Sequence, residues 1–444
     1  MAVFDLTMFI SSLTVLASVF HRTLASQNEY KLGVLLPFTY DLNWDHPSAK
    51  EYASAVTLAV RKVNAHPRLL KGAKLGFLWS NTACNKTKLI QQQQFQIDQG
   101  VVGFIGPSCH AHKAVNTAKK NHKAVVSFDC QVNRVWNKAQ HSNFACTNPL
   151  HSKAASKLIE LIKKRGLKRV NIIYEDGAKW HSFKKYFTHL LKKNNIATGL
   201  KRKIQYHVFF SRVPEYLYLL PFKSQATIII AAFDLTREIV YTTQAHFEKN
   251  PYSPFDSHQF ISTPLDRLSM RMYILRPFKW FFSAYKLTTP RRTNVTIRGF
   301  RKLSLISEVP TVETRKFAKF EKLVRKASPR KPWFSKAYEG CLYLEKKCIF
   351  DRSHAKVPFE AVYLYDAVFQ FAHALHEVLE AQQKPSGVNI IKKLKGRQFI
   401  GADGYQHRFD ENANVVYNYT VLKLRKDDRN QLSMLPTNDD VSQQ

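Results

Sequence analysis

Short apolar runs alternate with amphipathic segments along most of the chain. Runs of strand length lie at residues 31–36, 75–79, 101–105, 124–128, 170–174 and 227–233. Segments with apolar residues at helical spacing lie at 48–66, 88–98, 112–121, 152–165, 181–194 and 359–383. Because the strand-length runs are almost continuously apolar, they predict parallel sheets covered by helices on both faces.

This alternation continues for too long to form one doubly wound sheet of ordinary size. Two such sheets side by side fit better, with a ligand bound in the cleft between them. The chain has no obvious Gly/Ser-rich linker, which favours two lobes joined by short crossovers. Near the carboxyl terminus, residues 404–424 are predicted to form a hairpin that turns at 410–412.

The amino terminus has the pattern of a secretory signal. Residues 6–20 are apolar and uncharged, and Thr23 and Ala25 are small residues at the positions expected before a cleavage site. We therefore expect residues 1–25 to be a signal peptide. The alternative is an uncleaved anchor, since Asp5 stands where a basic residue is usual. The best later apolar segment, 226–233, is too short to cross a bilayer.

Three glycosylation sequons agree with a secreted, extracellular protein. They begin at Asn85, Asn294 and Asn418. In an oxidising compartment the six cysteines are expected to form disulfides. The even number permits complete pairing, but the sequence by itself leaves several pairings open.

The chain is strongly basic. Sixty-eight Lys and Arg residues against 33 Asp and Glu give a formal net charge of +35. Such an excess is typical of proteins that bind nucleic acid, anionic membranes or acidic polysaccharides. Here it is spread along the chain, with no zinc-finger spacing and no aromatic–basic alternation, so we do not expect a nucleic-acid partner. A solvated basic surface and an attraction to anionic glycans or lipid headgroups both remain open.

The sequence contains no recognisable catalytic motif. A nucleophile elbow, a His-Glu-X-X-His zinc motif and a phosphate-binding glycine loop are all missing. His110 and His112 follow a turn, but such a pair is more often hydrogen-bonded surface than a metal site. We therefore expect no enzymatic activity, no metal ion and no organic cofactor.

Four segments resemble one known family. They are 32–37 (LGVLLP), 104–109 (FIGPSC), 365–368 (YDAV) and the closing stretch 396–412 (GRQFIGADGYQHRFDEN). Together they are similar to the receptor family ligand-binding region, which has the type I periplasmic-binding-protein-like fold. The similarity covers about 30–424, and its closest match is the extracellular domain of natriuretic-peptide-type receptor guanylate cyclases.

The resemblance implies a chain that crosses three times between two lobes. We expect these crossings near 144–149, 300–307 and 384–387. The predicted boundaries are 27–146 and 305–384 for lobe 1, 147–304 and 385–424 for lobe 2, and 425–444 for a polar tail.

The resemblance also implies one disulfide, between Cys84 and Cys109, which reaches into the Gly-Pro-X-Cys turn. The remaining pairs rest on proximity in the sequence alone. The simplest arrangement joins nearest neighbours, namely Cys130 with Cys146 and Cys341 with Cys348.

Ligands of this fold contact loops that follow the carboxyl ends of strands. The residues that fall there are Ser108, His110, Asp129, Gln131, Asp176, Trp180 and Asp234. Relatives that bind amino acids place Ser and Thr hydroxyls in the first two loops, whereas this chain has His110, Lys113, Asp129 and Cys130 there. This difference argues against a free α-amino acid as ligand.

The family further implies a chloride ion bound at the Gly-Pro-X-Cys turn. Ser108 and Cys109 match that turn, and Ser80 is the candidate hydroxyl, although Ser108 stands where the family usually has glycine.

Receptors of this family continue into a transmembrane helix, a kinase-like domain and a cyclase domain, whereas this chain ends in a polar tail. We therefore expect a soluble binding protein or decoy, or one piece of a receptor. It should form a homodimer and bind a peptide or a small signalling molecule, and a basic peptide is disfavoured by the positive charge. The alternative is a secreted basic protein that binds sulfated glycans.

Overall fold

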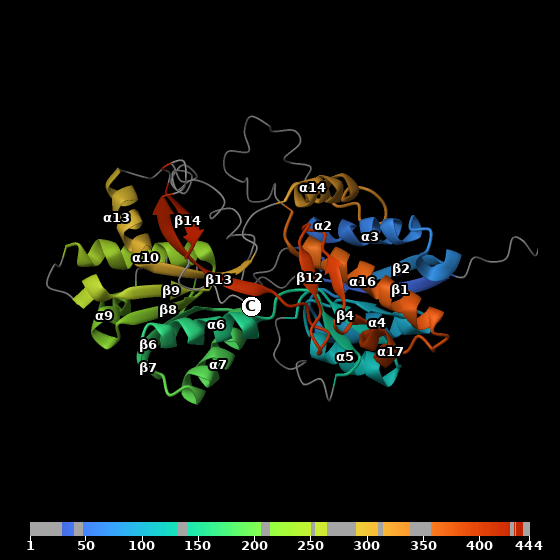
Figure 1. Ribbon diagram of the computed structural model, residues 1–444, viewed down its shortest axis with the longest axis horizontal. Helices are drawn as coiled ribbons and strands as arrows, with labels where there is room; N and C mark the ends of the chain where they lie inside the picture. The colour runs from blue at the N-terminus through green and yellow to red at the C-terminus, as the bar shows by residue number, and fades with distance from the viewer. Residues whose placement is uncertain are drawn as a thin grey trace, which may run out of the picture.

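The structure is a computed structural model of the 444-residue chain. It describes residues 29–39, 48–130, 141–205, 214–249, 254–263, 290–309, 314–337, 357–426, 430 and 432–437. The predicted signal peptide, Gln131, Cys341 and Cys348 lie outside these residues. The described chain forms two α/β lobes side by side (Figure 1), which confirms the predicted fold class.

Lobe 1 is built on a five-stranded parallel sheet in the order β2-β1-β3-β4-β5. The strands are β1 (Glu29–Leu36), β2 (Lys74–Asn81), β3 (Gly103–Ile105), β4 (Ala124–Ser127) and β5 (Phe144–Cys146). Successive residues point to opposite faces, and both faces are buried. Val34 packs into the core on one face, and Leu35 packs into the core on the other. This is why the strands are apolar at consecutive positions rather than alternating.

Helices from distant parts of the sequence cover the two faces of this sheet. The larger core contains residues of α2 (Ala49–Tyr52), α3 (Ser54–Asn64), α14 (Arg315–Ala327), α16 (Glu360–Glu380) and α17 (Gly387–Leu394). The smaller core on the opposite face contains residues of α4 (Lys86–Asp98) and α5 (Ala111–Lys120). In Figure 1 the late helices α14, α16 and α17 lie in the same lobe as the early strands. Lobe 1 is therefore complete only when the chain returns to it.

Lobe 2 is built on a seven-stranded mixed sheet in the order β14-β13-β10-β9-β8-β6-β7. The strands are β6 (Arg169–Glu175), β7 (Ala197–Ile204), β8 (Ala226–Ile230), β9 (Gln259–Ser262), β10 (Leu303–Val309), β13 (Asn418–Lys426) and β14 (Leu432–Pro436). The five strands from β6 to β10 are parallel, and β13 and β14 add an antiparallel pair. One core lies under α6 (His151–Lys164) and α7 (Ala178–Lys193). The other lies under α10 (Phe233–Phe247) and α13 (Pro290–Arg301).

The structure corrects two of the predicted crossings. All of β10 pairs within the lobe 2 sheet, so the second crossing follows Val309 and does not lie at 305. The third crossing does not lie at 384–387, because α17 begins there and packs against β4 and β5 of lobe 1. Its apolar residues Ile390, Ile391 and Leu394 belong to the lobe 1 core. The chain leaves lobe 1 only after the small antiparallel sheet of β11 (Gln398–Ile400) and β12 (Gln406–Arg408).

The predicted hairpin at 404–424 is also wrong. Its first part, β12, pairs with β11, whereas β13 pairs with β10 and β14 in the other lobe. The real terminal hairpin joins β13 to β14 and lies partly in the predicted polar tail 425–444. Met434 of β14 is buried in the lobe 2 core. A strand this short, flanked by polar residues, leaves only a weak apolar pattern in the sequence.

Phe371 on α16 tests the packing of lobe 1. Its ring is fully buried, and a Cβ added to Gly103 of β3 would lie 2.5 Å from it, so helix and sheet are in close contact. Phe371→Ala should lower the free energy of unfolding by about 3–5 kcal/mol through lost contacts and a cavity. Phe95→Ala is the control, because Phe95 is 55% exposed. Urea denaturation measures both; equal midpoints for the two variants would contradict this packing.

Candidate ligand site at the carboxyl ends of the strands

The carboxyl ends of the parallel strands lie on the side of the crossings in both lobes. The first crossing leaves lobe 1 at the end of β5, and the second leaves lobe 2 at the end of β10. Because β3, β4 and β5 are parallel, and β6, β8 and β10 are too, their following loops share these edges. The predicted residues on these loops are Ser108, His110 and Asp129 in lobe 1 and Asp176 in lobe 2, and Asp234 lies just after one of them, in the first turn of α10.

The turn after β3 has a conformation that requires glycine at its start. Gly106 has φ +89°, and a Cβ there would lie 2.4 Å from the carbonyl oxygen of Leu35. Cys109 in this turn is joined to Cys84 by a disulfide, as predicted. His110 has φ 56° in the left-handed region, and its Nε2 lies 3.0 Å from the carbonyl oxygen of Cys84. The His110 ring therefore braces the same pair of segments as the disulfide.

The loops after β3 and β4 are bonded to each other. The Ser127 hydroxyl lies 3.0 Å from the carbonyl oxygen of Pro107, to which it donates, and its oxygen also accepts from the amide of Asp129 at 3.2 Å. Ser108 and Asp129 are 8% and 3% exposed, so little of either residue is open to solvent. These bonds fix the backbone from which both residues project.

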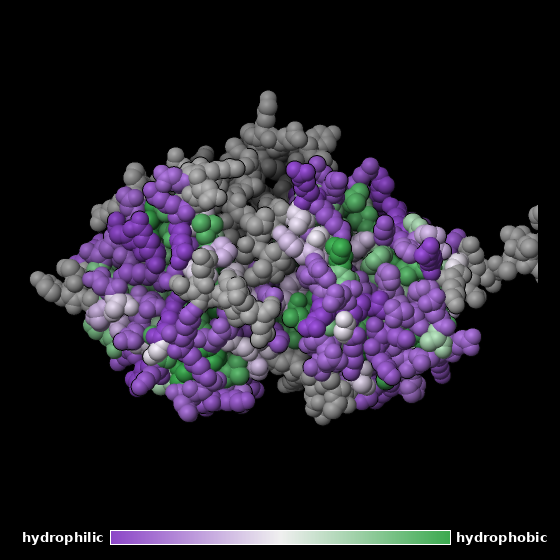
Figure 2. Space-filling view, in the orientation of Figure 1, coloured by the Kyte–Doolittle hydropathy of each residue, from purple (hydrophilic) through white to green (hydrophobic). Residues whose placement is uncertain are grey.

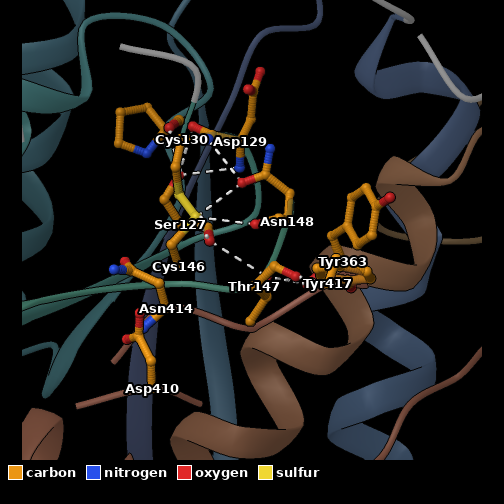
Figure 3. The surroundings of a disulfide bond; sticks show 11 residues. Ser127, Asp129, Cys130, Cys146, Thr147, Asn148, Tyr363, Asp410, Asn414 and Tyr417 are labelled. Atoms are coloured by element: carbon orange, nitrogen blue, oxygen red, sulfur yellow. Dashed lines mark hydrogen bonds between the residues drawn. A yellow bond between two sulfur atoms is a disulfide. The ribbon is translucent and has the colours of Figure 1, made fainter. Parts of the chain in front are cut away.

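A second disulfide closes the ends of β4 and β5 (Figure 3). It joins Cys130 to Cys146, which confirms the pair inferred from proximity. The amide of Cys130 also donates to Oδ1 of Asn148 at 2.9 Å. Asn148 lies two residues after the end of β5, so its side chain and the disulfide hold the same two loops together. The predicted pair Cys341–Cys348 lies outside the described residues.

The first and third crossings run side by side as a short parallel ladder. Cys146 donates its amide to the carbonyl of Ala413 at 3.0 Å and accepts the amide of Val415 at 2.9 Å. The Tyr417 hydroxyl then donates to the carbonyl of Thr147 at 3.2 Å, and both residues are buried.

The first crossing is also bonded to lobe 1. The Thr147 hydroxyl donates to the carbonyl of Tyr363 on α16 at 2.8 Å (Figure 3). Sequence reasoning missed Thr147, Asn148 and Tyr417. The sequence feature that could have indicated them is the polar pair Thr147-Asn148 between a buried strand and Pro149, because a proline there ends the strand and turns the chain away from the sheet.

A buried cluster of ionisable groups precedes the third crossing. Nε2 of His407 lies 2.9 Å from Oδ2 of Asp403, and Asp366 on α16 accepts the amide of Ala402 at 3.0 Å. Burial, and then the neighbouring Asp403 carboxyl, raise the pKa of Asp366 well above its ordinary value. A Cβ on Gly401 would lie 2.9 Å from Asp366 Oδ2, so a larger residue does not fit inside this cluster.

Two further bonds connect this cluster to the second crossing. The Thr314 hydroxyl, at the start of α14, donates to the carbonyl of Asp403. Lys316 Nζ donates to the carbonyl of Gly401 at 3.0 Å. The cluster therefore holds α14, α16 and the β11–β12 segment in one unit.

In lobe 2, Asp176 binds basic side chains. Lys203 Nζ lies 3.1 Å from Oδ2, and the amide of Gly177 donates to Oδ1 at 3.1 Å. The hydrogen bond from Lys203 is the main reason that the pKa of Asp176 lies below its ordinary value. Trp180, also predicted to face a ligand, is 1% exposed and packs in the core beneath α6 and α7.

Asp234 belongs to a charged network at the start of α10. Its Oδ1 lies 3.8 Å from Nη1 of Arg237. The Nε of the same arginine donates a hydrogen bond to Oε1 of Glu238 at 3.0 Å. Arg292 of α13 donates to the other oxygen of Glu238 at 2.7 Å. Arg237 and Glu238 are buried and were not recognised in the sequence.

The remaining predicted sites keep their status as predictions. Ser80 on β2 is paired with Leu35 of β1, and the turn after β3 packs against Leu35. The Ser80 hydroxyl oxygen accepts a hydrogen bond from Nε2 of Gln96 at 2.9 Å. This leaves the Ser80 hydroxyl proton able to donate to an anion, so the chloride hypothesis fits this residue. Asn85, Asn294 and Asn418 are all exposed, as glycosylation requires.

Within the ranges given above, no group of three or more His, Cys, Asp or Glu residues is placed to hold a metal ion. Among the described helices, none is both long enough and apolar enough to span a membrane.

Comparison with known proteins identifies the family. Residues 51–427 match the model of the receptor family ligand binding region, and the chain belongs to this family. Guanylate cyclase 32E of Drosophila melanogaster is 21% identical over 386 residues, which cover 83% of this chain and 29% of that protein. The speract receptor of Strongylocentrotus purpuratus is 21% identical over 413 residues, covering 83% of this chain and 33% of that receptor. The chain thus spans about a third or less of these curated relatives.

A solved structure supports the fold. A solute binding protein of an ABC transporter from Rhodopseudomonas palustris BisB5, crystallised with 3,4-dihydroxy benzoic acid, superposes with a TM-score of 0.55 at 14% identity. The match covers 92% of this chain and 96% of that one. The two-lobed, periplasmic-binding-protein-like architecture is therefore shared, and the chain is related to receptor guanylate cyclases through their ligand-binding region.

Removal of the Cys130–Cys146 disulfide tests how strongly the first crossing depends on it. The bond closes a loop with a sequence separation of 16, so Cys130→Ala/Cys146→Ala should lower the free energy of unfolding by about 2–4 kcal/mol. The matched control is Cys84→Ala/Cys109→Ala, which opens a separation of 25 and should cost a similar amount. Urea denaturation measures the loss in both variants. If Cys130→Ala/Cys146→Ala keeps the wild-type midpoint, the backbone ladder between Cys146 and the third crossing is enough to hold the first crossing.

Asp366 should make stability depend on pH. Its folded-state pKa lies above the ordinary value of 3.8, so the stabilisation present at low pH is lost as the pH rises through the folded-state pKa. Asp366→Asn stays neutral and keeps an oxygen for the amide of Ala402. Its melting temperature should therefore fall less than that of the wild type between about pH 4 and pH 8. Asp98→Asn, at an exposed position on α4, should follow the wild-type curve.

Proposed function

We propose that this chain is an extracellular, receptor-type binding module for a peptide or a small signalling molecule. The observation that carries the proposal is the position of both carboxyl edges beside the three crossings, where loops bearing polar side chains from the two lobes meet the connecting segments. A ligand that contacts both sets of loops would couple its binding to the relative orientation of the lobes. In this arrangement His110, which is partly exposed, would contact the ligand from lobe 1, and Asp234 from lobe 2.

The proposal includes secretion, glycosylation and pairing of two copies. The apolar amino terminus supports entry into the secretory pathway, and two disulfides agree with an oxidising compartment. The exposed positions of Asn85, Asn294 and Asn418 support attachment of glycans there. Homodimer formation rests on the family relationship.

The charge of the protein bears on the choice of ligand. With a formal net charge of +35, the module repels basic peptides at long range, although salt confines this effect to about 8 Å at physiological ionic strength. We therefore propose a neutral or acidic ligand.

A thermal-shift assay with peptide pools of defined charge and pools of small metabolites tests this function. A ligand at about 100 times its Kd stabilises the folded state by roughly 2.7 kcal/mol, which raises the melting temperature measurably. Neutral or acidic pools should raise it, and Asp234→Ala should reduce the effect of a neutral ligand that donates hydrogen bonds, whereas the exposed Asp98→Ala should not. A shift with basic peptides alone at 0.15 M salt, reproduced by calorimetric titration, would overturn the charge argument.

A second candidate function is binding to sulfated glycans. The net charge favours it, and hydrophilic residues cover most of the described surface in the view of Figure 2. The two functions are compatible, since a glycan would bind the outer surface of a lobe rather than the loops at the crossings.

A further inference from the structure

Basic residues are concentrated in one continuous segment of lobe 2. Residues 178–204, which contain α7, the following turn and β7, have no Asp or Glu. The basic residues of this segment are Lys179, Lys184, Lys185, Lys192, Lys193, Lys201, Arg202 and Lys203. Other acid-free basic segments exist, such as 322–337 with six Lys or Arg residues, but this one combines a helix with the edge strand β7, which makes it a candidate for a charged binding surface.

The pairing of β7 shows which of its basic residues face α7. Lys201 lies opposite Ile172 of β6, and Lys203 lies opposite Tyr174. Both β6 residues pack in or against the core beneath α6 and α7. Paired residues on neighbouring strands point to the same face, so Lys201 and Lys203 project on the α7 side. Both are exposed, and β7 is the edge strand of its sheet.

Two lysines of α7 complete the same surface. Nζ of Lys184 lies 4.7 Å from the centre of the Tyr174 ring, which places this side chain over β6 next to β7. Burial, and then the charges of Lys201 and Lys185, lower the pKa of Lys184. We call Lys184, Lys185, Lys201 and Lys203 the α7–β7 patch.

The patch has little internal charge compensation. Asp176 binds Lys203, and its side chain is 37% exposed. One carboxylate beside four ammonium groups leaves an excess of positive charge on a small area. Mutual repulsion of like charges is relieved when an anionic partner binds, and the released counterions add to the free energy of binding.

We propose that the α7–β7 patch binds a sulfated polysaccharide. The proposal rests on the second candidate function and assigns it a surface. Lysines spread over a helix and an edge strand suit a linear chain with separate sulfate groups, because an ammonium group is a point charge without a fixed bidentate geometry. Single-stranded nucleic acid would require aromatic rings open to its bases, whereas Tyr174 lies under Lys184. A membrane would require apolar anchors beside the basic residues, whereas the large exposed apolar residues described in lobe 2, Leu219 and Phe222, lie on segments that pack against the opposite face of the sheet.

Heparin fragments are the probe for this patch. Lys185→Gln/Lys201→Gln removes two exposed charges from it. The matched control, Lys319→Gln/Lys322→Gln, removes two exposed charges from α14 in lobe 1. At 0.15 M NaCl the patch variant should lose on the order of tenfold in heparin affinity, and the slope of log Kd against log salt should fall by about 1–2. The control should stay within about twofold of the wild type. Unchanged melting temperatures establish that both variants fold.

Each other outcome contradicts a defined part of the proposal. Equal losses in the two variants would show that net charge rather than this patch binds heparin, so the assigned surface would be wrong while the glycan function stands. A wild-type protein that does not bind heparin at 0.15 M NaCl would refute the glycan function as well. Stronger binding to a single-stranded oligonucleotide or to phosphatidylserine vesicles, lost in the patch variant, would assign the surface to that partner. Equal affinity for an unsulfated, carboxylated polysaccharide would remove the requirement for sulfate.

Discussion

The backbone bonds around Cys146 join the first and third crossings at the edge of lobe 1, and the placement of the segments that lead to lobe 2 depends on them. Cys146 ends the last strand of lobe 1, forms a disulfide with the loop after β4 and pairs on both sides with the returning segment at Ala413 and Val415. Thr147 extends the connection to α16 and receives the Tyr417 hydroxyl. The bonds of Cys146 with the returning segment use only carbonyl and amide groups, so they do not depend on the side chains of the loops nearby, whereas the bonds of Thr147 and Tyr417 use their hydroxyls.

Electrostatics divides lobe 2 into two regions with different properties. At the start of α10, Arg237 is buried with Glu238, and Arg292 contacts the same carboxylate, so these charges are compensated within the fold. On the α7 side, lysines face solvent with Asp176 as their acidic contact. The first arrangement holds two helices together, whereas the second leaves positive charge available to a partner. A high net charge is thus compatible with both structural and binding roles.

Much of the fold could be predicted from the sequence, because parallel strands buried on both faces leave a clear apolar signal. The turn at Gly106 and the Cys84–Cys109 disulfide followed from the family resemblance. The second and third crossings could not be placed, because β10 and α17 have apolar faces that fit either lobe until tertiary packing selects one. The contacts of Thr147 and Tyr417 were invisible for another reason: their partners are main-chain carbonyls, which every residue type provides. Trp180 shows the opposite error, since a position after a strand does not decide whether a side chain points to a ligand or into the core.

The order in which the lobes are completed has a consequence for synthesis of the chain. The strands of lobe 1 lie within residues 29–146, but α16, which covers one face of their sheet, begins only at Glu360. Likewise, β13 and β14 complete the lobe 2 sheet from the last part of the described chain. Neither lobe can bury its apolar surface while the ribosome is still producing the middle of the protein. The nascent chain therefore exposes an unfinished sheet for most of its translation, so the moment at which lobe 1 can fold follows from the position of one helix in the sequence.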